Sequence, residues 1–97
     1  MEYREHCLHC RKRFGEDFDY VHRWLDEFYG SDQFKTKHRK LRHHLKGIAE
    51  VRLKWGDRAA EAAKLHIIDD LQAIEDKKAD ESWIAYDEAD YARRGYW

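Results

Sequence analysis

Apolar residues recur every three or four positions through most of this chain, and no proline interrupts them. That spacing places the apolar side chains on one face of an α-helix, whereas a β-strand requires alternation. Gly15, Gly30 and Gly56 fall where periodic segments end, and glycine is a common helix stop. We therefore predict an all-α fold, a compact antiparallel bundle of four to five helices with one long central helix.

The expected helices follow the segments between these stops. A chain of 97 residues is long enough for one domain with one modest core. We expect that single domain to span residues 1–97, with its core in residues 2–75 and a shorter C-terminal helix at about 80–94. The helices expected before it cover residues 2–14, 17–29, about 34–55 and 57–75.

The charges are numerous but nearly balanced, since 40% of the residues are charged and the net charge is −1. Together with many aromatic residues, this predicts solvated helix faces rather than disorder. Residues 1–56 are basic on balance and residues 57–97 are acidic, which indicates internal pairing or a homo-oligomer. The first residues contain no apolar run, so we expect neither an export signal nor a membrane span, and a cytoplasmic protein.

The only two cysteines form a CxxC pair, Cys7 and Cys10. They fall on the same expected helix face as Tyr3 and Phe14, so we interpret them as small core residues. A redox site would need a βαβ context, and a zinc ribbon would need a second CxxC pair.

Residues 35–55 form the expected long central helix. Positions 35–46 hold six Lys or Arg residues and no acid, which raises nucleic-acid binding as a hypothesis. The net charge and a pI near 6.6 make nucleic acid an unlikely partner. Arg52 falls within the apolar stripe and would need a carboxylate there, so we predict a structural ion pair with Asp69 (or with Asp70 or Asp26). The predicted stripe consists of Phe34, Leu41, Leu45, Ile48, Arg52 and Trp55.

Several histidines border the apolar stripe of their own helix, and two of them have an aspartate four residues later. When helices pack, these stripe edges meet, so side chains from different helices can converge on one pocket. Imidazole and carboxylate are normal ligands of Zn, Mn, Fe and Ni. Each His/Asp pair could equally be a hydrogen bond on a helix surface. The predicted metal ligands are His6, His22, Asp26, His44, His66 and Asp70.

The run HRKLRHHLKGI (residues 38–48) resembles the HR-x-LRHH-x-x-GI signature of a family of small, uncharacterised, mostly helical bacterial and phage proteins. HRWLDE (residues 22–27) and HIIDDL (residues 66–71) fit as well, so the similarity covers about residues 6–71. The resemblance brings no established activity. It suggests a phage or mobile-element accessory protein acting on a host component. The signature positions that the resemblance implies are His6, His22, Trp24, Asp26, His38, Arg39, Arg42, His43, His44, Gly47, His66 and Asp70.

Two further functional hypotheses follow. The first is a binding protein that holds a divalent metal or a phosphate-containing, nucleotide-like ligand, or a protein partner; His38, Arg39, Arg42 and His43 would contact that ligand. His43 is expected on the outward face. The second is a metal-dependent phosphohydrolase, because His22, His43 or His44, and Asp69 or Asp70 follow the order of helical His/Asp hydrolases. The adjacent His-Asp dipeptide of those enzymes is absent, so an enzyme is not favoured.

Overall fold

The computed structural model describes residues 3–27, 39–75 and 77–96, and all regular structure in these residues is helical. The radius of gyration is 12.3 Å, close to the value of about 12–13 Å expected for a compact chain of this length. The predicted all-α fold is confirmed. In chain order the elements are α1 (Tyr3–Phe14), α2 (Asp19–Leu25), α3 (Arg39–Arg42), α4 (Leu45–Trp55), α5 (Asp57–Glu75), the 3-10 helix η2 (Glu81–Trp83) and α6 (Glu88–Arg93).

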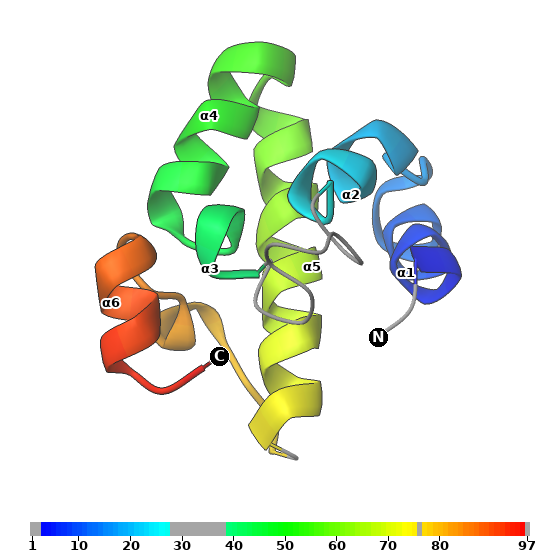
Figure 1. Ribbon diagram of the computed structural model, residues 1–97. Coiled ribbons are helices and arrows are strands. Elements are labelled where there is room, and N and C mark those ends of the chain that lie inside the picture. Colours follow the sequence, from blue (N-terminus) through cyan, green and yellow to red (C-terminus); the bar gives the residue numbers. More distant parts are fainter. Residues whose placement is uncertain (1–2, 28–38, 76, 97) are drawn as a thin grey trace.

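The longest of these elements, α5, runs through the middle of the molecule (Figure 1), with α4 along one side and α2 and α1 on the other. Its first half is rich in buried alanines, whose small side chains let neighbouring helices approach closely. Ile67 and Leu71 continue this buried face, as the periodicity predicts. The long central helix is therefore α5, and our assignment of that role to residues 35–55 was wrong.

The segment predicted as one helix up to Trp55 is broken within the described residues. α3 ends at Arg42, His44 has an extended backbone, and α4 starts at Leu45. The His44 ring links the two helices across the break. Its Nδ1 accepts a hydrogen bond from the Gly47 amide (3.1 Å), and its Nε2 donates to the Leu41 carbonyl (3.1 Å). A Cβ at Gly47 would overlap the carbonyl oxygen of Arg42, so glycine is required for α3 to lie against the first turn of α4.

The break changes which residues of α4 face the core. Gly47, Ile48 and Val51 are buried, whereas Leu45 and Arg52 are exposed. The predicted ion pair between Arg52 and Asp69 is wrong, since Arg52 Nε instead lies 3.1 Å from Asp57 Oδ1 at the surface. A periodicity counted through the break assigns Leu45 and Arg52 to the wrong face, whereas Ile48 is buried as predicted.

The buried face of α1 centres on His6 and Cys10, while Tyr3 is exposed and Phe14 is half-buried. Cys10 thus lies in the core as predicted, with His6 one turn before it. In and before α2, Phe18, Val21 and Leu25 form the buried face. Phe18 has a left-handed backbone (φ 54°) at the entry to this helix.

Residues 77–96 complete the first turn of α4. The amides of Leu45 and Lys46 donate hydrogen bonds to the carbonyls of Ala85 (2.8 Å) and Tyr86 (3.1 Å). These contacts provide acceptors for backbone N–H groups that have no partner within the helix at its start. Ile84, Ala85 and Tyr91 are buried, so the core extends beyond the expected limit at residue 75.

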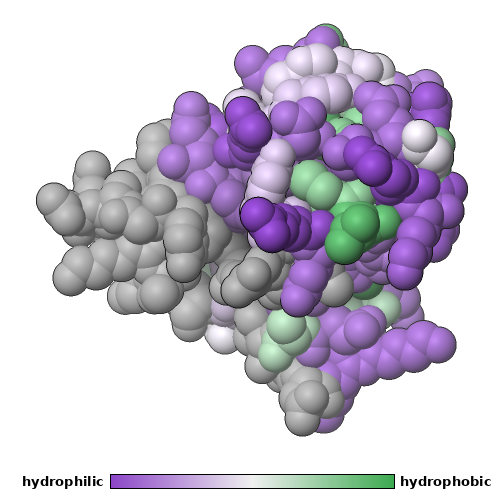
Figure 2. Space-filling model, turned by 90° about the vertical axis from the view of Figure 1, so that its right-hand side faces the viewer, coloured by the Kyte–Doolittle hydropathy of each residue, from purple (hydrophilic) through white to green (hydrophobic). Residues whose placement is uncertain are grey.

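Among the residues that Figure 2 colours by hydropathy, most of the visible surface is hydrophilic, and hydrophobic residues form only a small area. Among the described helices, none combines the length and the apolar character needed to cross a lipid bilayer.

Candidate metal centre

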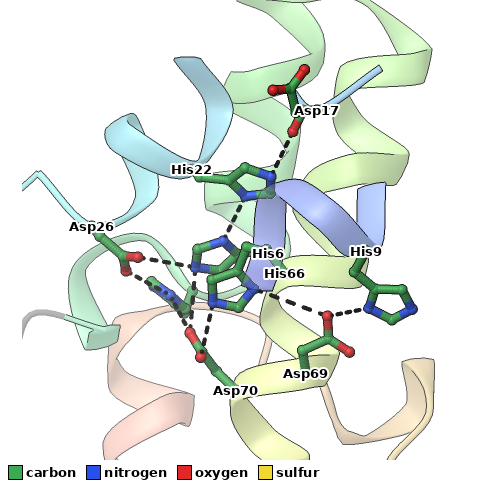
Figure 3. A network of polar contacts seen from close by, with 9 residues as sticks. His6, His9, Asp17, His22, Asp26, His66, Asp69 and Asp70 are labelled. Carbon is green, nitrogen blue, oxygen red and sulfur yellow. Dashed lines mark hydrogen bonds and ion pairs between the residues drawn. The ribbon is translucent and has the colours of Figure 1, made fainter. Parts of the chain in front are cut away.

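The centre is built on α5, where His66 and Asp70 are four residues apart and therefore share one helix face. Both side chains are buried. In Figure 3, His22 and Asp26 from the region of α2 and His6 from α1 point towards them. His43, from the break between α3 and α4, is also buried here.

Two histidines and two aspartates place nitrogen and oxygen atoms at nearly equal separations, and Asp26 turns a different carboxylate oxygen to each histidine. His43 Nε2 is 3.1 Å from Asp70 Oδ2 and 3.3 Å from Asp26 Oδ1. His66 Nε2 is 3.3 Å from Asp70 Oδ2 and 3.3 Å from Asp26 Oδ2. In a tetrahedral zinc site with ligands at about 2.0–2.1 Å, neighbouring donor atoms are about 3.3 Å apart. The set Asp26, His43, His66 and Asp70 therefore has the spacing of a metal site.

Ring orientation separates this set from a second histidine group. The lone pairs of imidazole lie in the ring plane, and the rings of His43 and His66 are inclined at 61°, so their nitrogens can point to one centre. His6, His22 and His66 also place nitrogen atoms within 4.8 Å of one another. However, His6 is stacked on His66 at 3.7 Å with planes 16° apart, so these lone pairs run nearly parallel. The trio is consequently a stack and not a ligand set.

His22 is bonded at both of its ring nitrogens. Its Nδ1 lies 2.8 Å from Nδ1 of His66, and its Nε2 lies 2.9 Å from the carbonyl oxygen of Asp17. Burial, with the neighbouring His66 and His6, lowers the pKa of His22 to about 3. His22 is therefore a neutral imidazole at physiological pH.

The charges at the centre favour an ionised Asp70. Burial by itself raises the pKa of its carboxyl group, but the adjacent imidazoles of His43, His6 and His66 outweigh burial and hold this pKa far below its usual value. Burial lowers the pKa of His66, yet Asp26 and Asp70 outweigh it and the pKa is raised. His66 Nε2 has no hydrogen bond of good geometry, although two carboxylate oxygens lie 3.3 Å away. A positive charge is thus favoured beside the two carboxylates, and either a protonated His66 or a bound metal ion would supply it.

His6 borders the centre on its other side. Its Nε2 lies 3.2 Å from Asp70 Oδ1, and burial is the main cause that lowers its pKa. Asp69 does not reach the four-donor set and instead pairs with His9, at 2.7 Å between Nδ1 and Oδ2.

Three of the predicted metal ligands, Asp26, His66 and Asp70, come together in the four-donor set. His6 and His22 lie against it, whereas His44 is turned away and caps α4, so its predicted place in the pocket is wrong. His43, expected on the outward face, belongs to the set instead. No sequence signal could have found it, because the extended backbone at His44 that sets the direction of His43 is not visible in the helical repeat.

The remaining predicted ligand contacts fall elsewhere. Arg42 is held by the protein: Nη1 donates to the Trp24 carbonyl (2.6 Å) and pairs with Glu27 (2.8 Å), and the guanidinium lies 4.1 Å from the centre of a Trp24 ring. His38 lies outside the described residues, as do Lys35 and Lys37 of the basic run, and the side chains of Arg39 and Lys40 are not described either.

Residues 1–94 match a protein family described as a domain of unknown function (DUF6915). The chain belongs to this family. The match extends past the similarity expected for residues 6–71 and includes the tail that completes α4. Comparisons with curated proteins and with solved structures found no match.

Proposed function

We propose that this protein binds one divalent transition-metal ion through Asp26, His43, His66 and Asp70. The observation that carries the proposal is that two histidine nitrogens each lie 3.1–3.3 Å from oxygens of both aspartates, although the four residues come from segments far apart in the sequence. Neutral imidazole and carboxylate are the ligands such ions take.

The alternative is a metal-free network of ion pairs, in which a protonated His66 supplies the positive charge between the two carboxylates. The raised pKa of His66 favours this state when no metal is bound. A divalent ion would instead balance Asp26 and Asp70 while both imidazoles stay neutral, and metal analysis of the protein separates the two states.

Two nitrogen and two oxygen donors near tetrahedral spacing favour Zn²⁺ over Mn²⁺, Fe²⁺ or Ni²⁺. Zinc has no preferred geometry of its own from d electrons and is commonly four-coordinate, whereas Mn²⁺ takes more oxygen ligands and higher coordination.

The test uses protein without a polyhistidine tag, incubated with Zn²⁺, desalted and analysed for metal by mass spectrometry. We expect close to one zinc ion per chain, lost in His43→Asn. His44→Asn is the matched control, because asparagine preserves a helix cap and His44 lies outside the set. A folded wild-type protein that retains no metal refutes the proposal, and so does equal loss of metal in both variants.

A metal-dependent phosphohydrolase is the second candidate, supported by unequal burial of the ligands. The Asp26 side chain is 27% exposed, while those of the other three are at most 3% exposed. Release of the ion by Asp26 would leave three protein ligands and the open position of a catalytic zinc site, through which a phosphate ester or nucleotide-like substrate could reach the metal. Turnover of p-nitrophenyl phosphate and of nucleotides with Zn²⁺ or Mn²⁺, lost in His43→Asn and kept in His44→Asn, is the expected result; no turnover by metal-loaded protein rejects the enzyme.

A further inference from the structure

A chain of two hydrogen bonds leads from the backbone to His66. The carbonyl oxygen of Asp17 can only accept, so Nε2 of His22, 2.9 Å away, carries a proton and donates it. A neutral imidazole has one N–H group. Nδ1 of His22 is therefore an acceptor.

The proton between the two Nδ1 atoms, 2.8 Å apart, then belongs to His66. The opposite arrangement would place two N–H groups on His22 and make it a cation. It would also leave both ring nitrogens of His66 without a proton once Nε2 binds a metal, so that His66 would be an imidazolate anion. The arrangement with the proton on His66 keeps both rings neutral.

We infer that His22 is a positioning residue, which fixes Nε2 of His66 as the metal-binding atom by accepting the Nδ1 proton. This inference rests on the proposed metal centre. In a metal-bound histidine, the group that accepts a hydrogen bond from the other ring nitrogen commonly sets both the tautomer and the ring orientation. Here the accepting group is another histidine, anchored in turn on Asp17.

The packing holds this chain in one geometry. His22 and His66 are fully buried, and their rings lie 5.1 Å apart with planes 21° from parallel. The Asp17 carbonyl belongs to the peptide that precedes Phe18, whose left-handed backbone is costly for a bulky residue. Such a conformation is maintained where surrounding contacts impose it, and here it lies next to the carbonyl that orients His22.

The first test compares two replacements of His22. His22→Leu fills similar space without an acceptor, whereas His22→Asn presents an oxygen near the position of Nδ1. In competition titrations against a zinc indicator, we expect His22→Leu to weaken Zn²⁺ affinity by roughly 10–100-fold, as loss of an outer hydrogen-bond partner commonly does. His22→Asn should retain most of the affinity. Circular dichroism of the metal-free variants checks that both are folded.

The second test needs no variant. In zinc-loaded wild-type protein with ¹⁵N-labelled histidine, NMR should show His66 with a proton on Nδ1 and metal on Nε2, and a scalar coupling between the Nδ1 atoms of His66 and His22 through the hydrogen bond. This measurement decides the inference even where His22→Leu does not fold.

The outcomes separate the two proposals. Wild-type protein that binds no zinc removes the metal centre and this inference with it. Zinc bound equally well by wild type and by folded His22→Leu, or an equal loss in the Leu and Asn variants, overturns only the role of His22. So does metal found on Nδ1 of His66.

Discussion

At the scale of single residues, the adjacent His43 and His44 have separate roles because the backbone is extended between two helices. His44 turns back to cap α4 and bonds to Leu41, and His43 reaches the carboxylates of Asp70 and Asp26. Both positions depend on Gly47, which lets the Arg42 carbonyl approach the first turn of α4.

Gly47→Ala should therefore destabilise the protein. The added methyl group overlaps a backbone oxygen, which cannot move as a flexible side chain can, so we expect a loss of about 1–3 kcal/mol in the free energy of unfolding. Urea denaturation measures this loss, and Glu50→Ala, at an exposed position of the same helix, is the control. An unchanged urea midpoint would show that α3 and α4 do not meet in this way.

Cys10 should resist alkylation in the folded protein. Burial raises the pKa of its thiol to about 12, so at pH 8 its thiolate fraction is roughly a thousandfold below that of a free cysteine. Iodoacetamide labelling followed by peptide mass spectrometry should show modification of Cys10 only after unfolding. Rapid labelling under native conditions would mean that α1 does not bury this residue.

At the scale of elements, the tail and α4 complete each other. The Ala85 and Tyr86 carbonyls accept from the first turn of α4, and the Asp90 carboxylate holds the loop in place by accepting from the Tyr86 amide (2.9 Å). Arg93 and Arg94 donate to the same carboxylate, at 2.6 and 3.0 Å. The C-terminal segment is thereby part of the fold that orients His44 and Leu45.

Asp90 should make this docking sensitive to acid. The Tyr86 amide, followed by Arg93, lowers the pKa of Asp90 to about 2. Because the folded-state pKa is below the unfolded value, the stabilisation is fully present above about pH 4 and is lost as the pH falls towards 2. Melting curves of wild type and Asp90→Asn should therefore differ at pH 5 and converge near pH 2. A difference that does not change with pH would exclude ionisation of Asp90 as its source.

The sequence predicts the elements better than it predicts their junctions. Periodicity locates α1, α2 and α5, since each has a continuous apolar face bounded by a glycine or a polar turn. It does not reveal the break at His43 and His44, because no proline or glycine lies there and each half still fits a helical repeat. The stripe counted through that break places Arg52 in the core, although Val51 occupies that position.

The same limit applies to the candidate site. The spacing of His66 and Asp70 predicts a shared helix face, and Asp26 lies beside His22 for the same reason. His43 could not be placed, because its direction depends on the extended backbone at His44 and not on any helical repeat. Whether His22 binds metal or hydrogen-bonds to His66 depends on ring planes, which spacing along the chain does not determine.

At the scale of the whole molecule, α5 is the common support of the proposed metal site. His66 and Asp70 on α5 are joined by Asp26 after α2 and by His43 before α4, so one ion would connect three parts of the chain around the central helix. His6 adds α1 through its contact with Asp70.

Removing metal should lower the stability of the whole protein. An ion present at one hundred times its dissociation constant stabilises the folded state by about 2.7 kcal/mol. For a domain of this size we expect EDTA to lower the melting temperature by roughly 10–20 °C. Scanning calorimetry with EDTA and after addition of excess Zn²⁺ measures the effect. A melting temperature that does not respond to either would contradict a metal shared by these segments.

The uneven burial of the four donors also has a kinetic consequence. Asp26 is the only one with an appreciably exposed side chain, and His43, His66 and Asp70 are enclosed by helices. A bound ion would therefore be accessible from the side of Asp26, where a chelator could contact it before all four residues have released it. Transfer of zinc to a chelator should then become faster as the chelator concentration rises, and a rate independent of that concentration would contradict access from this side.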